Sequence, residues 1–361
     1  MSPQSKNIHI DLRLPRGWNQ CATEQLEMIA ATIMRHTLRQ DRYHPFDWLR
    51  VKTELFFLLT ETHPLPAETH PLPRPAREGS SYPASTDEEQ QPLMVAFNDR
   101  RPWWKKVITP SHTGEGRGRG PFPLHAWQVH SFIDQHLKWL DDEKAQPLIV
   151  FPYKRLFREW RWQWRWPFIK KHYLAPGELL QDFSWEQYRH LQDYMELFVR
   201  QQNQILKLQQ TAVGAPVPAA AKAPVPDGSP SGKLAALQRE AQATRNRFLA
   251  VLFKLGDNRQ SAITKKVTDV RWQVILFWWS GLMRYLQKEY PHCFKSSGGK
   301  KGKTPANPLQ LYVNITATMQ KYLQLDEDKV NRQTFHLTLE ALERMAKEAE
   351  EMERISKKHG K

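Results

Sequence analysis

The stretch "TDVRWQVILFWWSGLMRYLQKEYPHCF", residues 268–294, decides the fold class of this chain. Its apolar residues recur at intervals of three and four positions, which is the period of one side of an α-helix. A helix that is apolar over so much of its circumference belongs near the centre of a bundle. The stripe consists of Trp272, Ile275, Leu276, Trp279, Leu282, Met283, Leu286 and Tyr290, and Phe277 and Trp278 widen it. We therefore expect a mainly α protein built as a helical bundle.

A second helix carries its start signals in "DFSWEQYRHLQDYMELFVRQQNQILKLQ", residues 182–209. Ser184 and Gln187 have the spacing of a capping box, in which each side chain accepts a hydrogen bond from the other residue's backbone N–H. Phe183 and Tyr188 have the spacing of a hydrophobic staple. We predict that this helix starts at Ser184. Further helices are predicted at residues 23–38, after Pro45, and at 127–140, 233–255, 309–323 and 328–357.

Proline-rich segments divide the chain into five predicted parts. The duplication "ETHPLPA" and "ETHPLPR", residues 61–74, starts a loop, because its prolines cannot donate backbone hydrogen bonds. "TAVGAPVPAAAKAPVPDGSPSG" is typical of a semi-stiff linker and is the predicted boundary between two halves. The parts are an N-terminal helical hairpin (1–60), a disordered Pro-rich loop (61–92), a helical segment with a Trp-rich tract (93–210), the Ala/Pro linker (211–232) and a C-terminal helical segment (233–361). Within the third part, "LMVAF" at 93–97 is a candidate short strand.

The composition points to a basic protein of a reducing compartment. The formal net charge is +15 over 361 residues, so the surface potential attracts nucleic acid, anionic lipid or acidic proteins. Cys21 and Cys293 are the only cysteines, too few for a disulfide framework or a thiolate metal site. No window offers about 18 uninterrupted apolar residues, and the first residues have no apolar signal core. We expect a cytoplasmic protein without a membrane span.

Several motifs that resemble chemical sites do not meet the requirements of those sites. In "SGGKKGKT", residues 297–304, Ser297 replaces the first glycine of a phosphate-binding loop, and Pro305 interrupts the helix that must follow it. "GEGRGRG", residues 114–120, lacks the spacing of a dinucleotide fingerprint. His125, His130 and His136 turn to different sides of their predicted helix. We expect no cofactor, no metal site and no enzymatic activity.

The tract "REWRWQWRWPF", residues 158–168, alternates tryptophan with arginine or glutamine. Alternation is the period of a β-strand, so the indoles would share one face and the polar side chains the other. We therefore predict a small extended element around residues 148–166, in which "LIVFPYKRLF" (148–157) could pair with the tract. The candidate contact residues for a partner or for nucleic acid are Arg158, Arg161, Arg165, Lys170, Lys171, Trp160, Trp162, Trp164 and Trp166.

Three interpretations of the tract follow from its chemistry. A core or a protein interface is favoured, because aromatic side chains dominate both, and burial of four neighbouring indoles removes a large apolar area from water. Nucleic acid is the second, since bases can stack on the rings while arginines neutralise phosphate. A membrane surface is the third, because tryptophan and arginine both suit that boundary.

Four segments carry a resemblance to a known group of proteins: "LPRGWNQCATEQLEMIA" (14–30), "FSWEQYRHLQDYMELF" (183–198), "VILFWWSGLMRYLQKEYPHCF" (274–294) and "NRQTFHLTLEALERMAKEAEEM" (331–352). In their order and character they resemble mainly helical proteins encoded by Bacteroidetes prophages and mobile elements, often near tail-morphogenesis genes. The aromatic pair followed by the "YPHCF" end is the most specific piece. The duplicated Pro-rich loop and the density of tryptophan depart from that group.

The resemblance implies a non-catalytic protein-binding role in the assembly of a phage-like particle, of the tail-assembly or chaperone type. Its partners would be phage structural or assembly proteins. The alternative is a basic nucleic-acid-binding accessory protein of a mobile element, which the net charge favours. The pattern of the sequence indicates no particular oligomeric state.

Overall fold

The computed structural model describes residues 14–38, 46–60, 62–64, 93–97, 122–124, 126–142, 145–161, 170–213, 230–256, 260–294 and 317–359. They are mainly α-helical with two small antiparallel sheets, which confirms the predicted fold class. The chain divides into two compact units, Met1–Pro147 and Leu148–Lys361. Each unit is described below by itself.

The first unit is built on a helical hairpin. Helices α1 (Thr23–Leu38) and α2 (Trp48–Leu59) contact each other, and α4 (Ala126–His136) packs against α2. Two short 3-10 helices, η1 (Trp18–Gln20) and η3 (Lys138–Leu140), complete this helical part. Its core is aliphatic and aromatic, and consists of Ile29, Val51, Leu55, Phe56, Val129, Ile133, Leu137, Trp139 and Leu140.

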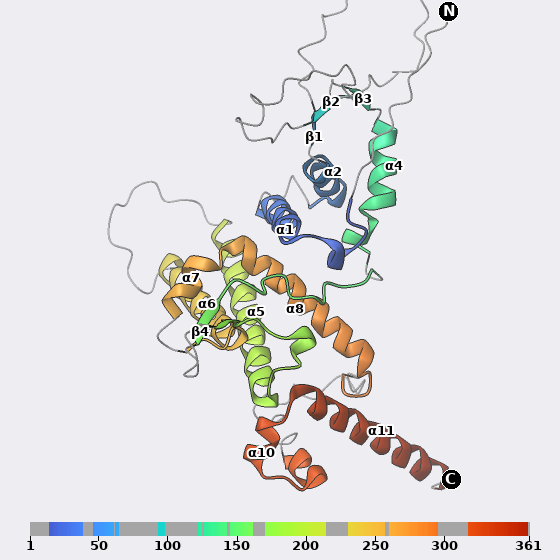
Figure 1. The fold of residues 1–361 in the computed structure, drawn as a ribbon, viewed down its shortest axis with the longest axis vertical. Helices are drawn as coiled ribbons and strands as arrows, with labels where there is room; N and C mark the ends of the chain where they lie inside the picture. Colours follow the sequence, from blue (N-terminus) through green and yellow to red (C-terminus); the bar gives the residue numbers. More distant parts are fainter. Residues whose placement is uncertain are drawn as a thin grey trace, which may run out of the picture. The chain divides into compact units, whose positions relative to one another are not determined.

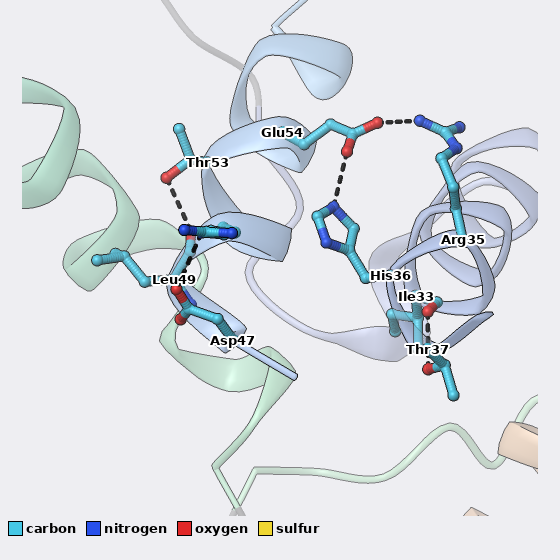
Figure 2. Close-up of polar contacts among 9 residues, drawn as sticks. Ile33, Arg35, His36, Thr37, Asp47, Leu49, Thr53 and Glu54 are labelled. Carbon is cyan, nitrogen blue, oxygen red and sulfur yellow. Dashed lines mark hydrogen bonds and ion pairs between the residues drawn. The ribbon is translucent and has the colours of Figure 1, made fainter. Parts of the chain in front are cut away.

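Polar contacts join the helices of this hairpin (Figure 2). Glu54 on α2 accepts hydrogen bonds from the Arg35 guanidinium and, at 2.8 Å, from His36, both in the last turn of α1. Asp47 caps α2 by accepting a hydrogen bond from the Leu49 N–H at 2.8 Å. An Asp at this position satisfies one of the backbone donors that every helix start leaves free.

A three-stranded antiparallel sheet also belongs to this unit. Strand β2 (Leu93–Phe97) lies between β1 (Thr62–Pro64) and β3 (Phe122–Leu124). The candidate strand at 93–97 is therefore confirmed. Residues 62–64 belong to the duplicated segment that we predicted to be a disordered loop, and they form β1 because β2 supplies pairing partners that the local sequence does not reveal. Residues 65–92 lie outside the described part of the chain.

The second unit is a bundle of helices (Figure 1), and its long members are α5 (Trp185–Val213), α6 (Pro230–Leu252), α8 (Asp269–Glu289) and α11 (Phe335–His359). The short helix η4 (Glu178–Leu180) precedes α5, α7 (Gln260–Lys266) lies between α6 and α8, and α10 (Glu327–Arg332) precedes α11. As the opening stretch predicts, α8 is buried over most of its length. Its buried residues are Trp272, Val274, Ile275, Trp278, Trp279, Gly281, Leu282 and Leu286.

The segment 148–157 lies against α8, and it does not form the strand pairing that we considered with residues 158–161, the described part of the Trp-rich tract. The Trp278 indole N–H donates to the Ile149 carbonyl at 3.1 Å, and Phe151 packs edge-on against Trp278 at 4.8 Å between ring centroids. At Gly281 the two backbones approach so closely that a Cβ atom would overlap the Leu148 carbonyl oxygen. Burial of its aromatic and aliphatic side chains on α8 therefore outweighs strand pairing for this segment.

The starts of α5 and α11 are joined. The predicted capping box is present, because the Ser184 N–H donates to Gln187 Oε1 at 3.0 Å and the Gln187 N–H donates to Ser184 Oγ at 3.2 Å. The Trp185 N–H donates to the Gln333 carbonyl at 2.8 Å, and the Phe335 N–H donates to the Phe183 carbonyl at 2.9 Å. These hydrogen bonds lie where α10 ends and α11 begins. The prediction of a single helix at 328–357 is therefore wrong, because the structure has two helices there.

The boundary between the compact units falls at Pro147 and Leu148, outside the predicted linker at 211–232. Helices α5 and α6 flank that linker and pack extensively on each other, so both belong to the second unit. Arg245 on α6 also reaches the start of α8, where its guanidinium donates to Asp269 at 2.6 Å and to the Val267 carbonyl at 2.6 Å. Linker composition therefore coincides here with a connection inside one bundle.

Candidate functional site

The predicted contact residues centre on a two-stranded antiparallel ladder. Strand β4 (Arg158–Arg161) pairs with β5 (Lys170–Tyr173), which follows the Trp-rich tract in the chain. The register places Trp160 opposite Lys171 and Arg161 opposite Lys170. The tract therefore begins as a strand, and the ladder aligns four of the candidate residues in two cross-strand pairs.

The remaining candidates divide into two groups. Arg158 stands at the start of β4 opposite Tyr173, and its side chain is exposed. The other candidates lie outside the described residues, and they are Trp162, Trp164, Arg165 and Trp166. The ladder thus brings cationic residues together, while the indole face that the alternation predicts stays a prediction.

Helix α11 presents a second candidate surface, which the search for contact residues missed. Its first turns are covered by the bundle, with Phe335 and Leu339 almost fully buried and Phe335 stacked on Tyr188 at 4.0 Å. Glu343 is also buried, and its Oε2 accepts hydrogen bonds from the backbone N–H groups of His292 and Cys293, each at 3.0 Å. These contacts fasten the "YPHCF" turn after α8 to one side of α11.

An apolar stripe on another side of α11 begins in the bundle and continues into the part of the helix that is exposed to solvent. It runs through Ala341, Met345, Ala349, Met352 and Ile355 at intervals of three and four, so the five side chains share one side of the helix. Burial decreases along it. Ala341 is buried, Met345 is half-buried, and Met352 and Ile355 are 69% and 45% exposed. We call the part of this stripe from Ala349 to Ile355 the exposed stripe.

Charged residues surround the exposed stripe and keep this part of α11 in water. The Lys357 ammonium lies 2.5 Å from a Glu353 carboxylate oxygen, one helical turn away. On the side that faces the "YPHCF" turn, His292 Nδ1 lies 3.4 Å from Glu350. Lys357, Lys358 and His359 occupy the last turn, where cations interact favourably with the helix dipole. The helix is thus stabilised locally while its apolar stripe stays open to solvent.

The two thiols are poorly suited to nucleophilic chemistry. Burial raises the pKa of the Cys21 thiol from its ordinary value of 9.0 to about 12. Burial, and then the hydrogen bond and charge of Glu343, raise the pKa of the Cys293 thiol to about 12. Because the thiolate is the reactive form, both sulfurs are almost fully protonated at neutral pH.

The described residues contain neither a metal-binding cluster nor a membrane-spanning helix. There, no group of three or more His, Cys, Asp and Glu side chains has a geometry that could hold a metal ion. None of the helices in the described ranges is both long enough and apolar enough to cross a membrane.

Comparison with known proteins identifies no relative. The chain matches no protein-family model, no curated protein and no solved structure.

Proposed function

We propose that this chain is a protein-binding protein whose partner contact is the exposed stripe of α11. The observation that carries the proposal is the course of this stripe, which starts beside the buried core at Ala341 and continues in solvent through Met352 and Ile355. Large exposed apolar side chains at helical spacing are the usual anchors when one amphipathic helix binds another. The expected partner is therefore a protein that contributes an amphipathic helix.

The resemblance described above suggests which proteins to test first. Following that resemblance, we expect the partner to be a structural or assembly protein of a phage-like particle, encoded by a gene adjacent to this one. This protein would then act by binding during particle assembly, without catalysing a reaction.

Site-specific photo-crosslinking can test this proposal in cells that make the protein. Met352→benzoylphenylalanine places the probe in the stripe, and Arg354→benzoylphenylalanine places it on the opposite side of the helix. We expect the first probe to form a defined adduct with one neighbouring gene product, and the second to form none. The purified pair should bind, and Met352→Glu with Ile355→Glu should abolish binding while Arg354→Gln preserves it. Equal crosslinking from both positions, or none from either, would contradict the proposal.

A second candidate function is nucleic-acid binding through β4 and β5. The specific observation is the pairing of Arg161 with Lys170, because like charges opposite each other in a sheet are destabilising unless an anion compensates them. The net charge of +15 also favours binding to nucleic acid, because it attracts anionic partners.

A salt titration separates this candidate from the first. Binding to single- and double-stranded DNA should weaken steeply as salt rises, since phosphate neutralisation releases counterions. Arg161→Gln with Lys170→Gln should flatten that salt dependence, while the matched pair Lys357→Gln with Lys358→Gln on α11 should leave it unchanged. An absence of binding even at low salt would exclude this candidate.

A further inference from the structure

A polar cleft of about 330 Å³ opens in the first unit, far along the chain from the surfaces discussed so far. Three segments form it: the loop that contains η1, the stretch from the end of α4 through η3, and the residues that follow η3. Its lining combines two indoles, two cations, one carboxylate and four side-chain amides. Among the lining side chains are Arg16, Trp18, Gln135, Lys138, Trp139 and Gln146.

The aromatic wall of the cleft is fixed by the fold. The Trp139 indole N–H donates to the Pro15 carbonyl at 3.1 Å and to the His136 carbonyl at 2.7 Å. Trp18 meets Trp139 edge-to-face, with 5.0 Å between the ring centroids. Trp139 is buried, whereas Trp18 is only half-buried and borders the cleft. The contacts of Trp139 hold this wall in place, and preorganisation of this kind lowers the cost of binding.

The loop that carries Trp18 is anchored as well. The Asn19 side-chain amide donates to the Pro147 carbonyl at 2.9 Å, and the Arg16 N–H donates to Gln20 Oε1 at 3.0 Å. The two anchors hold both ends of η1, so Trp18 and Arg16 keep their places in the lining.

The charge of the rim favours an anion. Arg16 and Lys138 are both exposed, and neither forms an ion pair within the described ranges. Asp142 is the single carboxylate of the lining. The cations of the lining thus outnumber its carboxylate, and both can donate charge-assisted hydrogen bonds, which are stronger than neutral ones. Gln135 and Gln146 add neutral donors and acceptors beside them.

We propose that this cleft binds a small planar ring that bears an anionic group, the chemistry shared by mononucleotides and aromatic carboxylates. The ring lies on Trp18, and the anion is held by Arg16 and Lys138. The side-chain amides of Gln135 and Gln146 hydrogen-bond to polar atoms on the edge of the ring. This site is independent of the exposed stripe of α11, so the two proposals stand or fall separately.

Ligand-observed NMR with the full chain tests the proposal. The probes are AMP and benzoate, which have ring and anion, with adenosine for a ring alone and inorganic phosphate for an anion alone. We expect AMP or benzoate to bind about tenfold more tightly than adenosine or phosphate, because stacking and charge-assisted hydrogen bonds each contribute about that factor. The tighter of the two probes then identifies the source of the anion. If phosphate binds as tightly as the tighter of AMP and benzoate, or if no probe binds at millimolar concentration, the proposal is overturned.

Variants locate the binding. Arg16→Gln and Lys138→Gln should each weaken binding of the preferred probe about tenfold. Arg50→Gln removes an exposed cation of the same unit outside the cleft and should change nothing. All three side chains are exposed, so circular dichroism melting curves should coincide with that of the unaltered chain. If Arg50→Gln weakens binding as much as Arg16→Gln does, the anion is attracted by overall charge, and the assignment to this cleft is wrong.

Discussion

Helices α8 and α11 show how differently two amphipathic helices of one bundle are covered. Helix α8 is buried from Trp272 to Leu286, on a face wide enough to contact segment 148–157 and helices α5 and α6. Helix α11 is buried only in its first turns, although its apolar stripe continues to Ile355. Side-chain pattern thus determines which side of a helix is apolar, whereas the neighbouring elements determine how far along the helix that side is covered. An apolar side that continues beyond the elements that bury it is available to bind a partner.

The largest test of this contrast compares two apolar residues on α11. Leu339 is 2% exposed, and Leu339→Ala should lower the free energy of unfolding by about 2–5 kcal/mol, as buried leucine truncations do. Met352 is 69% exposed, and Met352→Ala should change it by less than about 0.5 kcal/mol. Urea unfolding followed by circular dichroism measures both. A comparable loss in Met352→Ala would show that the exposed stripe is covered within the chain itself.

A second test concerns the close contact on α8. Gly281→Ala adds a Cβ atom where the Leu148 backbone already lies, and overpacking of this kind costs about 1–3 kcal/mol. Ser280→Ala, at the exposed neighbouring position, is the control and should leave stability unchanged or slightly higher, because alanine favours helix. Thermal melts of the two variants side by side measure the difference. If Gly281→Ala is as stable as Ser280→Ala, segment 148–157 does not press on α8.

A third test, with an expected effect of about the same size, concerns the hydrogen bonds of Glu343 that tether α11 to the turn after α8. Glu343→Ala leaves the His292 and Cys293 N–H groups without their acceptor, which costs about 1–3 kcal/mol. Glu343→Gln keeps an acceptor oxygen and should restore part of that loss, while the exposed control Glu351→Ala should cost nothing measurable. Hydrogen exchange of the His292 and Cys293 amides gives a local readout. Unchanged exchange in Glu343→Ala would contradict the tether.

Local signals predicted much of the fold. The capping box at Ser184 and Gln187 and the wide stripe of α8 depend on residues within a few positions of each other, so the sequence contains them in full. The strand period of the Trp-rich tract is likewise local, and β4 starts where it predicts. Features that need a distant partner were not predictable in this way.

The missed features share that dependence on distant contacts. Residues 148–157 were expected to pair as a strand, but their aromatic side chains pack on α8, and β5 takes the position beside β4. The break before Phe335 reflects backbone hydrogen bonds to the start of α5. Nothing in the sequence around Gly281 indicates that the backbone of Leu148 lies against it. Among the surfaces, the candidate residues of β4 and β5 were identified from their chemistry, whereas the cleft around Trp18 joins segments that no local pattern connects.

The hydrogen bonds between the starts of α5 and α11 can form only late in the synthesis of the chain. Contacts at this junction link residues very far apart in sequence, and the hydrogen bond between His336 and the Leu179 carbonyl spans 157 positions. Helices α5 and α6 can pair while the rest is still being synthesised, because the contacts between them are closer in sequence. The junction can close only after α11 has left the ribosome. Until then the side of α5 that contacts Phe335 lacks this partner, and transiently uncovered apolar surface of this kind favours aggregation.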